Sequence, residues 1–163
     1  MKVNKILVPL DGSRVAEAAL PKAVELIRDN SCATLILLRA AKATACPGVD
    51  PIDAQVTAVH EAKAYLETVA ARLRENGVFK VKTSIWYGAP AQSILDAARM
   101  TKPDLIMMGT HGRSGIGRLI VRSVAESVLR GTRTPLFLIR IDGRQMATPV
   151  GQAPAREQEA ANV

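Results

Sequence analysis

Five short apolar segments alternate with longer amphipathic ones, and this alternation constrains the fold more than any other feature of the chain. The apolar segments are Lys5–Val8, Thr34–Leu38, Val81–Tyr87, Leu105–Met108 and Leu136–Ile139. Their lengths are those of β-strands, and all but the third, in which polar and apolar residues alternate, are nearly continuous apolar runs, as in buried strands. Regular alternation of such strands with helices favours a parallel sheet covered by helices on both faces.

The segments between the strands carry apolar residues at helical spacing. Ser13 is a predicted N-cap for the first helix, whose apolar stripe reaches Ile27 and contains Pro21. Because proline cannot continue a helix without distortion, Pro21 is expected to kink it. A loop is predicted over Ala41–Gln55, followed by a long helix from Val56. Pro90 is predicted near the first position of the third helix.

The segment after the fourth strand is rich in glycine and carries positive charge. Its glycines are Gly109, Gly112, Gly115 and Gly117, and its arginines are Arg113, Arg118 and Arg122. The S-x-x-E pattern from Ser123 to Glu126 predicts a capped helix start behind it. Glycines allow backbone N–H groups to approach an anion closely, and a helix start adds unpaired donors, so the segment suits a phosphate. A flexible surface loop before a capped helix is the alternative, since no Walker A sequence occurs in the chain.

A second loop, from Pro9 to Ser13, follows the first strand. In doubly wound sheets, ligands bind beyond the carboxyl ends of the strands, where the strand order reverses. If the first and fourth strands are neighbours at that point, both loops line one crevice. Asp11 would then face a ribose, or a metal ion on the phosphates. The alternative for Asp11 is an Asx turn or a helix cap.

Composition narrows the class of protein. The length of 163 residues fits one domain, and no apolar run approaches the ~18 residues of a membrane span. The net charge of +7 is read as a soluble basic surface, whereas the local excess of arginine in the glycine-rich segment fits an anionic ligand. With only 3% aromatic residues, binding to nucleic acid is not expected. The two cysteines, Cys32 and Cys46, form neither a disulfide framework nor a metal motif. A cytoplasmic protein is the expectation.

The last 22 residues differ in composition from the rest. The segment 142–163 is polar, rich in Ala, Pro, Gln and Glu, and has no sustained apolar period. It is predicted to be a disordered tail behind a single domain of residues 1–141.

Between Lys2 and Arg140 the sequence resembles the universal stress protein family. The resemblance is carried by the opening KILVPLDGS, by Gly88-x-Pro90 and by the block PDLIMMGTHGRSGIGRLIVRSVAESVLRGTRTPLFLIR. The family has a nucleotide-binding signature, G-x2-G-x9-G-[ST]. Gly109 and Gly112 match its first two positions and Ser123 matches its last. Arg122 stands where the third glycine is expected.

The resemblance implies a three-layer α/β/α sandwich of the adenine nucleotide alpha hydrolase-like kind, with a five-stranded parallel sheet of order 3-2-1-4-5. It also implies a homodimer through the last strand, Leu136–Ile139. The implied ligand is an adenine nucleotide, ATP or AMP, with Mg²⁺ or Mn²⁺ on the phosphates and Asp11 as an indirect metal contact. Pro9, Asp11 and Ala40 would contact adenine and ribose, with Leu10 and Met108 beside them. Gly109, Gly112 and Ser123 would hold the phosphates, with His111, Arg113, Arg122 and Val124 alongside.

Two questions stay open at this point. The Arg122 side chain either adds a charge-assisted bond to a phosphate or fills the phosphate site. No nucleophile–base pair is evident, because His111 is a lone histidine near the glycines and His60 is expected on a helix surface. The sequence therefore favours a nucleotide-binding sensor or regulator, with at most slow, incidental ATP hydrolysis, over an enzyme. The rival is a dimeric interaction protein that binds no nucleotide because of Arg122.

Overall fold

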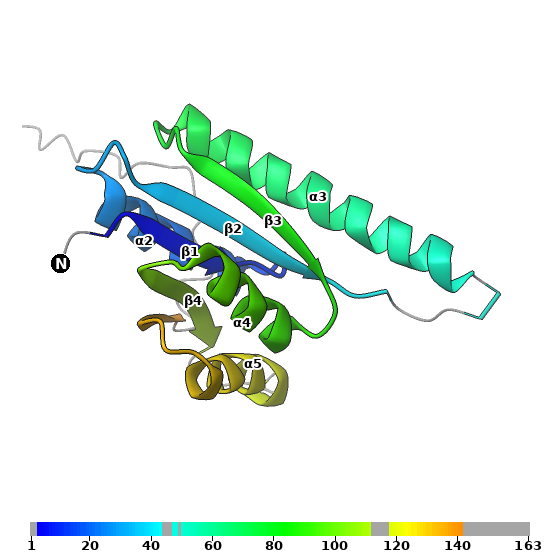
Figure 1. Ribbon diagram of the computed structural model, residues 1–163. Coiled ribbons are helices and arrows are strands. Elements are labelled where there is room, and N and C mark those ends of the chain that lie inside the picture. Colours follow the sequence, from blue (N-terminus) through cyan, green and yellow to red (C-terminus); the bar gives the residue numbers. More distant parts are fainter. Residues whose placement is uncertain (1–2, 44–46, 49, 112–117, 142–163) are drawn as a thin grey trace, which may run out of the picture.

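The five apolar segments form one five-stranded, all-parallel sheet in the computed structural model (Figure 1). The structure describes residues 3–43, 47–48, 50–111 and 118–141; for 111 and 118–123 the description covers the backbone. The strands are β1 (Lys5–Pro9), β2 (Thr34–Ala41), β3 (Val81–Tyr87), β4 (Leu105–His111) and β5 (Leu136–Ile141). Their order, β3-β2-β1-β4-β5, confirms the predicted fold class.

Helices cover both faces of this sheet, because successive strand residues point to opposite sides and both sides are apolar. The helices are α1 (Arg14–Glu17), α2 (Ala19–Ile27), α3 (Pro51–Glu75), α4 (Pro90–Thr101) and α5 (Arg118–Gly131). Residues of α1, α2 and α3 share one core with Ile6, Leu35 and Met107. Residues of α4 and α5 share the other core with Leu7 and Met108.

The first predicted helix is broken rather than bent. It ends at Glu17 and resumes at Ala19, with Ala18 between the two parts. Pro21 is therefore the third residue of α2, where the backbone N–H would have no partner within the helix in any case. The proline does interrupt the apolar stripe, but the break lies three residues before it.

The helix α3 begins five residues earlier than predicted, and the preceding loop is correspondingly shorter. Asp50 caps it: its Oδ1 accepts a hydrogen bond from the N–H of Ile52 at 2.7 Å. Pro51 occupies the first helical position, which suits its fixed φ. In Figure 1 the N-terminal turns of α3 project beyond the carboxyl ends of β2 and β3.

Two predictions at the glycine-rich segment are wrong. The strand β4 does not end at Met108 but continues to His111, since Gly109, Thr110 and His111 pair with Ile139, Arg140 and Ile141 of β5. The helix α5 starts at Arg118, so Ser123 is its sixth residue and not an N-cap. The S-x-x-E pattern thus lies inside a helix, because no residue between Arg118 and Arg122 interrupts helical backbone.

Candidate nucleotide site at the carboxyl ends of the strands

The predicted switch point lies between β1 and β4. These strands are neighbours, with Ile6 beside Leu105 and Leu7 beside Ile106. From β1 the chain proceeds to β2 and β3 in one direction, while β4 and β5 lie on the other side. The loop after β1 and the end of β4 therefore lie at the same edge of the sheet, as a crevice of the doubly wound type requires. Pro9, Leu10, Met108 and Gly109 are buried there.

The Asp11–Ser13 turn, which follows β1, has a defined conformation. The N–H of Ser13 donates to Asp11 Oδ1 at 2.8 Å, which makes an Asx turn, and Gly12 has a φ of +90°. Ser13 Oγ in turn accepts the N–H of Ala16 at 3.1 Å, so the predicted N-cap is confirmed. Asp11 is exposed. Among the described residues, the Ser13 N–H is the hydrogen-bond donor found for this carboxylate, and it contacts Oδ1.

Ala40 lies near the end of β2 and pairs with Trp86 of β3. It follows Leu38 by two positions and so points to the face that α4 and α5 cover, where Leu38 and Met108 share a core. Trp86 packs against the same core, and its indole N–H donates to Ser84 Oγ at 3.0 Å. The small side chain of Ala40 is therefore flanked by a larger aromatic one on the same face.

Gly109 has a packing role that the sequence did not reveal. A Cβ at this position would overlap the carbonyl oxygen of Val15 and lie 2.8 Å from its carbonyl carbon. Only a residue without a side chain allows α1 to approach β4 so closely. The first glycine of the family signature is thus explained by contact between two backbones, whether or not it also approaches a phosphate.

Of the remaining predicted site residues, the structure describes some and not others. Gly112 and Arg113 lie outside the described residues, as does the segment 142–163 predicted to be a tail. His111 is the last residue of β4. Arg122 and Ser123 are residues of the helix α5. Val124 is partly buried and packs against the core beneath α4 and α5.

One residue beside the candidate site was missed. Arg39 is partly buried near the end of β2, and its guanidinium lies over the ring of Tyr65 and beside Gly12. A signal was present, since Arg39 is a lone charged residue directly after the apolar run Leu35–Leu38. Charged residues at the carboxyl end of a buried parallel strand face the edge where such sheets bind ligands.

Two further features bear on the class of site. Over the described part of the chain, no three His, Cys, Asp or Glu side chains come together in a way that could hold a metal ion. No helix of the described residues is long and apolar enough to cross a membrane.

The chain is similar in sequence and in fold to proteins of a known family. The model of the universal stress protein family matches residues 2–140. A universal stress protein of Methanocaldococcus jannaschii is 29% identical over 140 residues, which cover 84% of this chain and 82% of that protein. The crystal structure of a universal stress protein family member from Burkholderia pseudomallei is 31% identical, with a TM-score of 0.67, over 85% of this chain and 96% of the other.

Two more distant structures share the fold and contain nucleotides. One is a universal stress protein in complex with cAMP, 20% identical, with a TM-score of 0.64 over 85% of this chain and 98% of that one. The other is a family protein from Arabidopsis thaliana with AMP bound, 19% identical, with a TM-score of 0.66 over 91% and 97%.

Proposed function

Because this chain belongs to the universal stress protein family, we propose that it binds an adenine nucleotide and acts as a sensor or regulator rather than as an enzyme. The observation that carries the proposal is the meeting of the Asp11–Ser13 turn and the end of β4 at the switch point of the sheet. The cAMP and AMP complexes of proteins with the same fold support the choice of an adenine nucleotide.

In this proposal Asp11 contacts the ribose. Its exposed carboxylate fits that role, since the Ser13 N–H holds Oδ1 in place and the exposed group can accept a hydrogen bond from a hydroxyl donor. Pro9, Ala40 and Met108 contribute apolar surface toward the base. The phosphates, with Mg²⁺ or Mn²⁺ where a metal is present, lie toward Gly109, Gly112 and Ser123. A nucleotide bound in this way would change the charge and the shape of the protein surface at one edge of the sheet. A partner protein that binds this surface would then distinguish the nucleotide-bound protein from the free one.

Arg122 determines which nucleotide the site accepts. A cation at the third glycine position either pairs with a phosphate or occupies the space of one. In the first case ATP binds, and in the second the site takes a shorter nucleotide such as AMP, or none. The last outcome is the rival function, a dimeric interaction protein without a nucleotide.

The decisive experiment identifies the small molecules released when the purified protein is denatured, and then titrates nucleotide-free protein with ATP and AMP in the presence of Mg²⁺. We expect co-purified adenine nucleotide, or rebinding of at least one of the two. Asp11→Ala should weaken binding without unfolding the domain, whereas Asp29→Ala, at the exposed far end of α2, should leave binding unchanged. Absence of both co-purified nucleotide and rebinding would contradict the proposal.

Arg122→Gly separates the two roles of the arginine. Tighter ATP binding in this variant would mean that the wild-type side chain blocks the phosphate site. Weaker binding would mean that the guanidinium is a phosphate ligand. Since Ser123 lies inside α5, it is not the cap that the sequence suggested, and Ser123→Ala tests phosphate binding without the loss of a cap.

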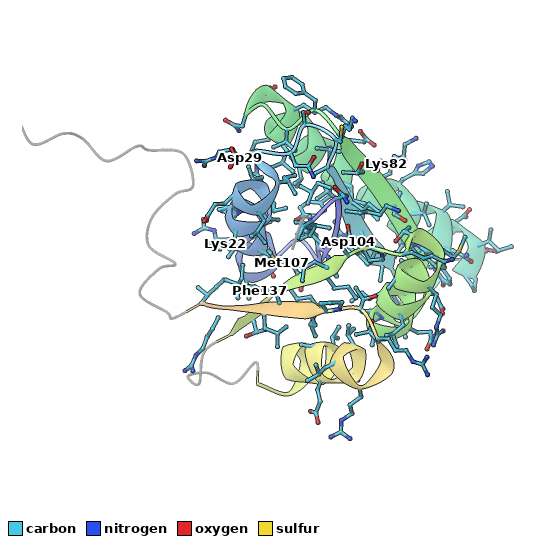
Figure 2. The ribbon with its side chains drawn as sticks, turned by 60° about the vertical axis from the view of Figure 1, so that its left-hand side comes forward. Lys22, Asp29, Lys82, Asp104, Met107 and Phe137 are labelled. Carbon is cyan, nitrogen blue, oxygen red and sulfur yellow. The ribbon has the colours of Figure 1, made fainter. Side chains whose placement is uncertain are left out.

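We also propose that two copies of the chain pair through β5. This strand is at the edge of the sheet, where it pairs with β4 alone among the described strands. Phe137 and Leu138 are each 44% exposed on its opposite faces. An open groove of about 670 Å³ lies beside it, bordered by Phe137 and Ile139 of β5 and by Pro21 and Lys22 of α2. Figure 2 labels Phe137 on β5 and Lys22 on α2, two of the residues that border this groove. An apolar edge strand of this kind is a template for pairing with another chain.

A further inference from the structure

The guanidinium of Arg39 lies beside the Asp11–Ser13 turn, next to the position where Gly12 lacks a side chain. A Cβ on Gly12 would be 3.8 and 3.9 Å from its two terminal nitrogens and 4.0 Å from its central carbon. All three are ordinary van der Waals distances for an added methyl group. The guanidinium therefore faces Gly12 across the space that a side chain would occupy, and it is the φ of +90° that favours glycine at this position.

The same guanidinium is held by an aromatic ring of α3. Its central carbon is 4.7 Å from the centroid of Tyr65, a cation–π distance. The ring itself is fixed at its far end, because the Tyr65 hydroxyl donates to Glu17 Oε1 at 2.8 Å. Arg72 donates to the other oxygen of Glu17 at 2.6 Å. The guanidinium thus lies between the turn and a network that joins α1 to α3.

Electrostatics place Asp11 in the same neighbourhood. Burial is the largest cause of the raised pKa of Tyr65, followed by its hydrogen bond to Glu17 and by the nearby negative charges of Glu17 and Asp11, while Arg39 acts in the opposite direction. The charges of Asp11 and Arg39 therefore both reach the Tyr65 hydroxyl. Among the described residues, the Arg39 side chain has no ion-pair or hydrogen-bond partner, and it interacts with the ring of Tyr65.

We propose that Arg39 is a positioning residue for the nucleotide site: together with the ring of Tyr65, it holds the Asp11–Ser13 turn so that the Asp11 carboxylate is presented to the ligand. This inference rests on the proposed function, in which Asp11 contacts the nucleotide. Arg39 acts through Asp11 and not by touching the ligand. A turn fixed before binding loses less conformational freedom when the nucleotide arrives, which is the general source of affinity from preorganisation.

The test measures the dissociation constants of ATP and AMP, with Mg²⁺, for five variants. Arg39→Met removes the cation and Tyr65→Leu removes the ring, and we expect each to weaken binding by roughly tenfold because the turn is no longer preorganised. The double variant should be no weaker than either single one, since both act on one contact. Tyr65→Phe keeps the ring and loses only the bond to Glu17, so it should retain the wild-type affinity. Arg28→Met, at the exposed end of α2, is the matched control and should also bind as the wild type does.

Three outcomes would overturn the inference. Loss of stability in Arg39→Met with unchanged affinity would make Arg39 a structural residue only. Loss of affinity in Arg39→Met but not in Tyr65→Leu would mean that the guanidinium contacts the ligand directly. Additive losses in the double variant would mean that the two residues act separately.

A measurement on the ligand-free protein keeps the inference testable if the wild type binds no nucleotide and the proposed function fails. The backbone amides of Gly12 and Ser13 should have NMR order parameters near the rigid value of about 0.85 in the wild type and in Tyr65→Phe, and below about 0.6 in Arg39→Met and Tyr65→Leu. Unchanged order parameters in the last two variants would show that Arg39 does not hold the turn.

Discussion

At Gly109 a single missing side chain decides how closely a helix can approach the sheet. Gly109→Ala would bring a methyl group onto the backbone of Val15, and backbone cannot move aside as a side-chain end can. We expect a loss of roughly 3 kcal/mol or more in the free energy of unfolding, at the upper end of overpacking effects. Urea denaturation of the ligand-free protein measures it without reference to any nucleotide.

Gly131→Ala is the matched control for this prediction. The added methyl group would meet only the end of the Leu95 side chain, with Cδ1 at 2.6 Å, which can change rotamer. Gly131 is also the last residue of α5, where alanine is the better helix former. The control should therefore lose much less stability. Equal losses in the two variants would mean that α1 yields easily and that packing does not explain Gly109.

Tyr65 gives the protein a specific sensitivity to alkali. Burial and the hydrogen bond to Glu17 raise its pKa in the folded state, so the neutral hydroxyl is favoured there. A group with a raised folded pKa contributes stability that is complete below its unfolded pKa, about 10 for tyrosine, and that is lost as the pH rises above it. We expect the free energy of unfolding to fall more steeply above about pH 10 in the wild type than in Tyr65→Phe.

Urea denaturation at a series of pH values from neutral to alkaline checks this slope. Tyr87→Phe serves as the control, because Tyr87 is 52% exposed at the end of β3. Its slope should follow that of the wild type. If Tyr65→Phe also follows the wild type, then another group controls the alkaline loss of stability.

Among the helices, α3 has an N-terminal part and a C-terminal part that differ in how much apolar surface they bury. Its buried residues, Ala62, Leu66, Val69, Ala70 and Leu73, all lie in the C-terminal part. Ile52 and Val56, which continue the apolar face toward the N-terminus, are 70% and 48% exposed on the turns that project past the strands. The apolar periodicity of the helix is therefore longer than the surface that it covers.

This division predicts opposite results from apolar deletions in one helix. Leu66→Ala, at a position that is 0% exposed, should cost about 2–5 kcal/mol of stability because it leaves a cavity. Ile52→Ser with Val56→Ser should change stability by less than about 1 kcal/mol, as exposed substitutions do. Thermal and urea unfolding measure both. A large loss in the exposed double variant would indicate that these turns are packed against something in solution.

Element types were predictable from the sequence, whereas their ends were decided by tertiary contacts. The five strands and their order followed from alternation and resemblance. The start of α3 was missed although Asp50 and Pro51 form a capping pattern, because prolines nearby favoured a loop. The end of β4 was misplaced at Met108, since pairing with β5 and contact with Val15 outweigh the low strand propensity of Gly109.

The candidate site was predictable to the extent that topology determines it. Strand order alone brought Pro9, Asp11 and Met108 to one edge of the sheet. Arg39 was not predictable in the same way, since its role depends on Gly12 and Tyr65, which are remote in sequence and meet only in the folded chain. A linear pattern marks residues that follow strands, but it does not reveal which side chain holds a turn in place.

For the whole molecule, the exposed edge of the sheet leads to a prediction about assembly. In a dimer paired through β5, Phe137 and Leu138 would be buried on the two faces of the joined sheet. Phe137→Glu would then place a charge in an apolar interface, where an unpaired carboxylate is strongly disfavoured. We expect the wild type to sediment as a dimer and Phe137→Glu to dissociate to folded monomers at the same protein concentration.

Phe79→Glu is the control for Phe137→Glu, because it makes the same substitution at a different edge of the sheet. Phe79 precedes β3 at the opposite edge of the sheet and is 84% exposed, so Phe79→Glu removes an exposed phenyl group and adds the same charge. Sedimentation equilibrium should find this variant as dimeric as the wild type, and circular dichroism should find all three proteins folded. A dimer that survives Phe137→Glu but not Phe79→Glu would place the interface on the β3 side. The end of β2, which carries Ala40 and Arg39, would then lie nearer to the partner than the end of β4 does, because β2 adjoins β3 whereas β4 adjoins β5.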